Sequence, residues 1–297
     1  ETNPLARAKM PNLNALLDGR SLLKESAPFD GEHASLLALD AGVGVDGLPQ
    51  SATGQAMLLT GKNISAELGY HYGPKPNPEV AAYLKGETIF SKCVAAGKRA
   101  ALLNAYPPRY FQGIDSGKRL YSSIPLGVTN AGLELFKYED LVAGRALSAD
   151  FTGEGWRTML GFPESPVMEP REAGRKLISL AMEYDFSFFE YWASDYAGHK
   201  QQMETAVGLM EAFDGVLGGI VESGKWKVED ERGKRKDELL VLVTSDHGNM
   251  EDLSTRKHTD ADVPLIVIGS KSAREESTRG MTDLTHVAPA IWRMVGV

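Results

Sequence analysis

Five apolar, β-rich runs recur along the chain and are separated by segments with helical spacing. The runs cover residues 35–41, 99–105, 186–192, 239–244 and 263–269. The segments with helical spacing cover residues 88–98, 171–184, 201–222 and 284–295. Because strands and helices alternate, we predict an α/β fold with a mostly parallel central sheet covered by helices on both faces.

The length and composition set limits on organisation, location and partners. A chain of 297 residues that is 42% hydrophobic can bury a large core, and we predict one domain over residues 1–297. The single cysteine, Cys93, excludes an internal disulfide, and no apolar run is long enough to span a membrane, so we expect a cytoplasmic protein with no membrane partner. A net charge of −8 argues against binding of nucleic acid. The oligomeric state is left open.

Three parts of the chain depart from the regular pattern. Prolines and glycines interrupt residues 106–170, for which we predict a small lid or insert. Residues 225–237 are mostly charged and predict a solvated loop. Glu1 replaces the usual starting methionine, and we expect further residues upstream of it.

Acidic and imidazole side chains follow two of the apolar runs. Asp246 and His247 come directly after the run 239–244, with His258 eleven residues later, while Asp195 and His199 follow the run 186–192. One helical turn would bring Asp195 and His199 together. Carboxylate and imidazole groups at strand ends predict two metal ions. For the other histidines, His33, His71 and His286, we expect ordinary hydrogen-bonded or exposed positions.

Two glycines belong to this pattern. We expect Gly248 to allow the turn that converges Asp246 and His247, and Gly198 to leave room for backbone to approach a metal.

Ser51 is the candidate nucleophile. It follows the run 35–41 and is predicted to begin a helix, where free N–H groups and partial positive charge suit a phosphate and an ionised serine. The alternative is that Ser51 only caps the helix.

In their order along the chain, these motifs resemble the alkaline phosphatase superfamily, especially its branch of cofactor-independent phosphoglycerate mutases and phosphopentomutases. The resemblance rests on residues 3–4 with 11–13, 47–49 ahead of Ser51, Asp195 with His199, 246–249, 258–259 before 263–264, and the closing segment 284–297.

The resemblance implies a two-metal site. Asp195, His199 and His258 would bind one ion, while Asp246, His247 and the Ser51 oxygen would bind the other. The ions would be Zn²⁺ or Mn²⁺, with Mg²⁺ a further option. The family also uses an aspartate of an Asp-Gly motif on its first strand. Asp18-Gly19 follows a helical pattern, so we expect that motif upstream of Glu1.

The resemblance also implies phosphoryl transfer through a phosphoserine at Ser51. The mutases have an asparagine and a histidine where this chain has Gln50 and Gln55, and they carry a large cap domain in place of residues 106–170. We therefore expect a phosphatase or phosphodiesterase acting on a small phosphorylated metabolite, with Lys62 and Arg109 as candidate contacts for the substrate anion. A phosphoglycerate mutase or phosphopentomutase, and a catalytically inactive metal-binding protein, are the alternatives.

Overall fold

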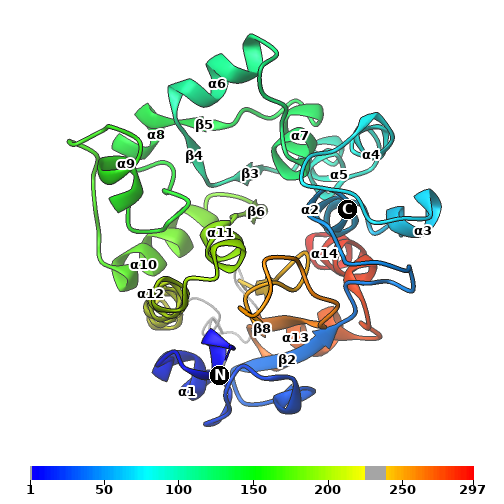
Figure 1. Cartoon of the computed structure of the whole chain (residues 1–297), viewed down its shortest axis with the longest axis vertical. Coiled ribbons are helices and arrows are strands. Elements are labelled where there is room, and N and C mark those ends of the chain that lie inside the picture. Colours follow the sequence, from blue (N-terminus) through cyan, green and yellow to red (C-terminus); the bar gives the residue numbers. More distant parts are fainter. Residues whose placement is uncertain (1, 225–238) are drawn as a thin grey trace, which may run out of the picture.

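The computed structural model describes residues 2–224 and 239–297 as an α/β arrangement of one four-stranded sheet, two short strand pairs and surrounding helices (Figure 1). The charged segment predicted as a solvated loop, 225–237, lies outside the described residues. In the part that the structure describes, no helix is long and apolar enough to cross a membrane. Cys93 is buried and unpaired.

The largest sheet is antiparallel throughout. Its strands, in spatial order, are β1 (Phe29–Asp30), β2 (Ala34–Leu39), β8 (Val263–Ile268) and β7 (Val241–Thr244). The two strand pairs are parallel: β3 (Ala100–Leu102) with β6 (Phe186–Phe188), and β4 (Ala105–Tyr106) with β5 (Phe136–Lys137).

The prediction of a mostly parallel central sheet was therefore wrong. β8 pairs antiparallel with both β2 and β7. For β7 and β8 the reason lies in their connection, residues 245–262, an irregular loop without a helix that includes Asp246, His247 and His258. Parallel neighbours need a long crossover, usually a helix, whereas antiparallel neighbours do not.

Helices cover both faces of the four-stranded sheet, as predicted. One face packs against α2 (Ser51–Thr60), α5 (Ile89–Ala95), α7 (Ser123–Asn130) and α14 (Val287–Val295). The other packs against α1 (Pro11–Leu16), α10 (Pro170–Ala181), α11 (Ala193–Lys200) and α12 (Met203–Glu222). Along β8, Leu265 and Val267 belong to the first core and Ile266 and Ile268 to the second, the two-residue alternation of a strand buried on both sides.

Short elements surround this framework. They are η1 (Pro4–Ala6), η2 (Lys24–Ser26), α3 (Ile64–Leu68), α4 (Pro78–Tyr83), α6 (Pro108–Asp115), α8 (Tyr138–Val142), α9 (Glu154–Thr158), α13 (Lys271–Thr278) and η3 (Leu284–His286).

The predicted insert, 106–170, contains α6, β5, α8 and α9, which lie along the top and upper left of Figure 1. It also contains α7, which packs on α2, where the Ser123 hydroxyl donates a hydrogen bond of 2.8 Å to the Ala52 carbonyl. The segment is thus built of short helices anchored to the main core. Its role as a lid stays a prediction.

Candidate metal centre

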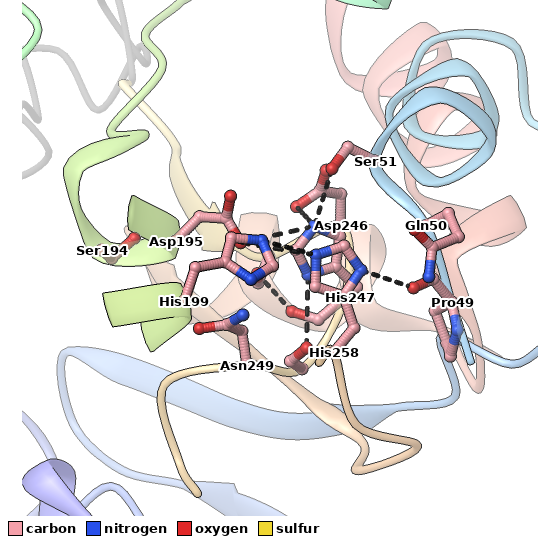
Figure 2. Close-up of polar contacts among 12 residues, drawn as sticks. Pro49, Gln50, Ser51, Ser194, Asp195, His199, Asp246, His247, Asn249 and His258 are labelled. Carbon is pink, nitrogen blue, oxygen red and sulfur yellow. Dashed lines mark hydrogen bonds and ion pairs between the residues drawn. The ribbon is translucent and has the colours of Figure 1, made fainter. Parts of the chain in front are cut away.

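Three segments that are distant in sequence bring acidic, imidazole and hydroxyl groups together (Figure 2). Helix α11 carries Asp195 and His199 one turn apart, as their four-residue spacing predicted. The loop after β7 carries Asp246, His247 and, further along, His258. Ser51 begins α2, as predicted, with Gln50 at the N-cap position.

Asp195, His199 and His258 form the tightest group. One ligand atom from each lies within 4.8 Å of the other two. The Asp195 Oδ1 atom is 3.4 Å from His199 Nε2 and 3.6 Å from His258 Nε2, and the two ring nitrogens are 3.2 Å apart. These are the donor atoms and the mutual distances that one divalent ion can bind.

The outer nitrogens of these two rings face backbone carbonyls. His199 Nδ1 lies 2.6 Å from the Arg256 carbonyl oxygen, and His258 Nδ1 lies 2.8 Å from that of Pro49. A proton on each Nδ1 satisfies the carbonyl and leaves the Nε2 lone pair directed at the group. Asp195 Oδ1 is buried and has no hydrogen-bond partner among the described residues. Outer hydrogen bonds of this kind are the usual support of metal-binding histidines, so the residues fit a metal.

The charges of this group are mutually dependent. Burial opposes ionisation of Asp195, but the His258 Nε2 atom at 3.6 Å and the charges of the nearby histidines outweigh it and lower the Asp195 pKa. Burial alone would lower the pKa of His258, whereas the contacts with Asp195 and the Pro49 carbonyl raise it. The site therefore favours an anionic carboxylate beside positive charge.

A second set of side chains adjoins the first. Ser51 Oγ lies 3.0 Å from His247 Nε2, which is 3.6 Å from Asp246 Oδ1 and 4.0 Å from Asp195 Oδ1. Ser51 makes no side-chain cap of its helix, so the capping alternative does not describe its contacts. Gln55 donates a hydrogen bond of 3.1 Å to Asp246 Oδ2. The two sets of side chains are thus contiguous, and His247 joins them to Ser51 at the N-terminus of α2.

The two candidate substrate contacts lie elsewhere. Lys62 follows the C-terminal end of α2, about 15 Å from Ser51 by the length of the helix, and its ammonium lies 5.8 Å from the Tyr83 ring centroid. Arg109 is exposed in the first turn of α6. Among the described residues no hydrogen bond or ion pair joins either side chain to Ser51, and their contact with the substrate stays a prediction.

The remaining histidines have the ordinary roles that we expected. His33 lies beside Glu32, and His286 beside Asp283. His71 lies 3.1 Å from Ser65 Oγ.

The sequence interpretation of Gly198 needs correction. A Cβ at Gly198 would collide with the side-chain amide of Asn249, so the missing side chain makes room for Asn249 rather than for backbone. Asn249 is 6% exposed, and its amide oxygen and nitrogen have no partner among the described residues. Sequence reasoning included Asn249 in the 246–249 motif but gave it no role of its own, and it missed the Asp246 contact of Gln55 and the partly buried side chain of Glu190. The signal available for Glu190 was an acidic residue inside the apolar run 186–192.

Comparison with known proteins agrees with this geometry. Residues 158–297, which include both histidine-bearing segments, match the profile of the metalloenzyme superfamily. This part of the chain is a metalloenzyme-superfamily domain. Divalent metal binding is the property that the superfamily implies for it, and the Asp195, His199 and His258 group provides a matching set of donors.

Curated relatives of this metalloenzyme domain are named 2,3-bisphosphoglycerate-independent phosphoglycerate mutases. One from Thiobacillus denitrificans is 32% identical over 141 residues, which are 44% of this chain and 25% of the relative. Another, from Mycoplasmopsis synoviae, is 26% identical over 142 residues, 46% of this chain and 25% of the relative. The match thus covers about a quarter of the length of these relatives.

Solved structures extend the likeness in fold to nearly the whole chain. An alkaline phosphatase from the Antarctic bacterium TAB5 aligns with a TM-score of 0.51 and 12% identity, over 97% of this chain and 95% of that one. A protein from Pyrococcus horikoshii aligns with a TM-score of 0.51 and 13% identity, over 99% of this chain and 90% of that one. The α/β fold is thus alkaline-phosphatase-like.

Proposed function

We propose that this protein is a two-metal phosphoric-ester hydrolase, a phosphatase or phosphodiesterase, that acts on a small phosphorylated metabolite through a phosphoserine at Ser51. The observation that carries the proposal is the position of Ser51 Oγ at the start of α2, 3.0 Å from His247 Nε2 and beside the Asp195, His199 and His258 group. In this proposal the trio binds one ion, and Asp246, His247 and Ser51 bind the other. Zn²⁺ or Mn²⁺ fits the mixture of imidazole and carboxylate donors, with Mg²⁺ a further option.

The reaction follows from these positions. Divalent ions supply the positive charge that favours an ionised hydroxyl and offsets charge on the phosphoryl group. Ser51 Oγ attacks phosphorus while the ester oxygen leaves, so that one P–O bond forms as another breaks. Water then attacks the phosphoserine, releases phosphate and restores the hydroxyl. The free N–H groups at the start of α2 would bind phosphoryl oxygens in both steps.

Access of water favours hydrolysis over retention of an acceptor. The side chains of Asp195 and His199 are 37% and 41% exposed, whereas those of His247 and His258 are almost completely buried. One side of the site is therefore open to solvent, and water can reach a phosphoserine there. A mutase has to hold its organic acceptor at the site until the phosphoryl group is returned.

A phosphoglycerate mutase or phosphopentomutase activity is the second candidate, because the curated relatives are named as phosphoglycerate mutases. It would require residues 106–170 or a second subunit to hold the acceptor. Isomerisation of a sugar or glycerate phosphate without release of free phosphate would support it against hydrolysis.

The test is release of phosphate from a simple aryl monoester and its diester by metal-free protein, and then with Mn²⁺ or Zn²⁺ added. We expect metal-dependent turnover that Ser51→Ala abolishes. Ser65→Ala is the matched control, because it removes a Ser–His contact of 3.1 Å outside the site and should retain activity. Metal binding without turnover of any ester or isomerisation of any phosphate would instead favour an inactive metal-binding protein.

A further inference from the structure

Two cationic side chains, Lys75 and Arg119, lie near each other, and Arg119 belongs to the predicted insert. The Lys75 ammonium donates a hydrogen bond to the carbonyl oxygen of Leu120, the residue that follows Arg119. The Arg119 guanidinium is close enough for its charge to oppose protonation of Lys75. Lys75 is partly buried and Arg119 is exposed. The fold thus places two positive charges together from segments more than forty residues apart.

The Lys75 segment packs directly against the candidate nucleophile. A Cβ built on Gly73 would lie 3.1 Å from both the Ser51 backbone nitrogen and the Gln50 Cβ, so the backbone at Gly73 contacts the start of α2. Lys75 is two residues further on, and its Cα is therefore no more than about 7 Å from that of Gly73. The cation pair lies within reach of a small molecule held at Ser51.

Two tyrosines lie between Arg119 and Glu190, the carboxyl group near Asp246. The Arg119 guanidinium lies 4.7 Å from the Tyr110 ring centroid, and the Tyr106 ring is 4.5 Å from that of Tyr110. The Tyr106 hydroxyl donates a hydrogen bond of 2.9 Å to Glu190, which is close enough to Asp246 for their charges to interact. Tyr110 is only 6% exposed, yet its hydroxyl has no hydrogen-bond partner among the described residues. That hydroxyl is enclosed by the protein and is close enough to Glu190 for the charge of that carboxyl group to act on it, so it supports the position of the Arg119 side chain rather than facing a ligand.

Neither Lys75 nor Arg119 has an acidic side chain as a partner in the part of the chain that the structure describes. Within residues 2–224 and 239–297, no ion pair involves Lys75 or Arg119. Acidic residues are not scarce, because the chain has 40 acidic and 32 basic residues. Burial and then the charge of Arg119 lower the Lys75 pKa, which means that the pair is electrostatically unfavourable as it stands. An anion between the two would offset that cost through charge-assisted hydrogen bonds.

We propose that Lys75 and Arg119 form a second anion site, which binds a carboxylate or a further phosphate of the substrate while its ester group lies at Ser51. This inference rests on the proposed function and narrows it to small phosphate esters that carry a second anionic group. The competing explanation is structural: Lys75 would only tie its loop to Leu120, and Arg119 would only cover the Tyr110 ring.

The kinetic test compares two substrates that differ in one charge, phenyl phosphate and 4-carboxyphenyl phosphate. For Lys75→Gln and Arg119→Gln, we expect kcat/KM for the carboxylated ester to fall by roughly tenfold or more, as loss of a charge-assisted contact implies. For phenyl phosphate, kcat/KM should change by less than about twofold. Lys118→Gln, which removes the neighbouring exposed cation, is the matched control and should behave as wild type with both esters. Equal losses with both substrates, or no loss with either, would overturn the second anion site.

A binding measurement separates this inference from the proposed function. Metal-free Ser51→Ala protein is titrated calorimetrically with 4-carboxyphenyl phosphate, alone and combined with Arg119→Gln or Lys118→Gln. Binding weakened by roughly tenfold with Arg119→Gln only supports the anion site, even if the wild-type protein turns over no ester. Identical affinities in all three proteins would show that Arg119 binds no anion, whatever the result at Ser51.

Discussion

The carboxyl group of Glu190 shows what a single residue can add to the candidate site. Glu190 directly follows Phe189 in the segment after β6, and Asn104 holds its backbone through hydrogen bonds of 2.8 and 2.9 Å. Burial raises the pKa of the Glu190 carboxyl to about 7; the hydrogen bond from Tyr106 lowers it and the charge of Asp246 raises it further. The group therefore changes charge near neutral pH.

This pKa predicts how stability depends on pH. Because the pKa is raised in the folded protein, Glu190 contributes stability that is complete below its ordinary value of 4.5 and is lost as pH rises through about 7. Glu190→Gln keeps an acceptor for Tyr106 and removes the titration. In metal-free protein, we expect the variant to be more stable than wild type above about pH 8, by roughly 1 to 3 kcal/mol.

Urea unfolding of wild type and variant across pH measures this difference. Glu204→Gln, at an exposed position in the first turn of α12, is the control and should follow the wild-type profile. Parallel profiles for wild type and Glu190→Gln would contradict the assignment of the titration to Glu190.

For single residues, the acidic and histidine side chains that could bind a metal were predictable from the sequence, whereas the residues that pack around them were not. Asp195 and His199 follow one apolar run and Asp246 and His247 another, so the alignment of strand ends predicted their convergence. Asn249 gave no such signal, because its burial depends on contact with Gly198 on a helix about fifty residues earlier.

Among the elements, α11 is the helix whose packing most directly sets the site. It carries Asp195 and His199, and its Gly198 lies against the side chain of Asn249. A methyl group at Gly198 would collide with the Asn249 amide, so either α11 or the loop after β7 would have to move. The candidate metal ligands lie on these same two segments, and their separation therefore depends on this contact.

Gly198→Ala should accordingly destabilise the protein by roughly 1 to 3 kcal/mol, the usual cost of overpacking. In a helix, alanine normally stabilises the protein relative to glycine. A loss of stability in Gly198→Ala would therefore point to the collision with Asn249. Gly208→Ala is the matched control, because it is also helical but has open space around its Cα, and it should be neutral or stabilising. Thermal unfolding of metal-free protein distinguishes the two. Stabilisation by both substitutions would show that Asn249 does not pack on Gly198 as described.

The elements themselves were predicted well where periodicity was strong. The segment 201–222 became α12 (Met203–Glu222) and the run 263–269 became β8. The run 186–192 was too long: β6 ends at Phe188 and α11 begins at Ala193. An apolar run does not determine strand pairing: residues 189–192 are apolar or aromatic apart from Glu190, yet they do not pair as a strand, and Trp192 is exposed.

For the whole molecule, strand direction was the property that local patterns could not predict. β2 and β8 pair antiparallel although more than 220 residues separate them, with Leu37 opposite Leu265. Alternating runs imply that both faces of a sheet are covered, which was correct, but they contain no information on the direction of a partner so distant in sequence.

A buried arginine holds one edge of this long-range sheet to the C-terminal part of the chain. Arg274 on α13 has no exposed surface, and its guanidinium pairs with Asp30 of β1. It also donates hydrogen bonds of 2.7 Å to Ser35 Oγ and of 2.8 Å to the Gly31 carbonyl. The hairpin of β1 and β2 is thereby fixed to α13 by one side chain.

Arg274→Met should therefore lower the free energy of unfolding by roughly 1 to 3 kcal/mol, because it fills similar volume but leaves the Gly31 carbonyl without this donor and the half-exposed Asp30 carboxylate with only Ser35 as a donor. Arg274→Lys should recover only part of the loss, since an ammonium cannot reproduce the planar fork. Lys271→Met removes an exposed ion pair with Glu275 on the same helix and should cost less than about 0.5 kcal/mol. Urea unfolding measures all three, and equal effects of Arg274→Met and Lys271→Met would show that the buried arginine does not hold the sheet edge.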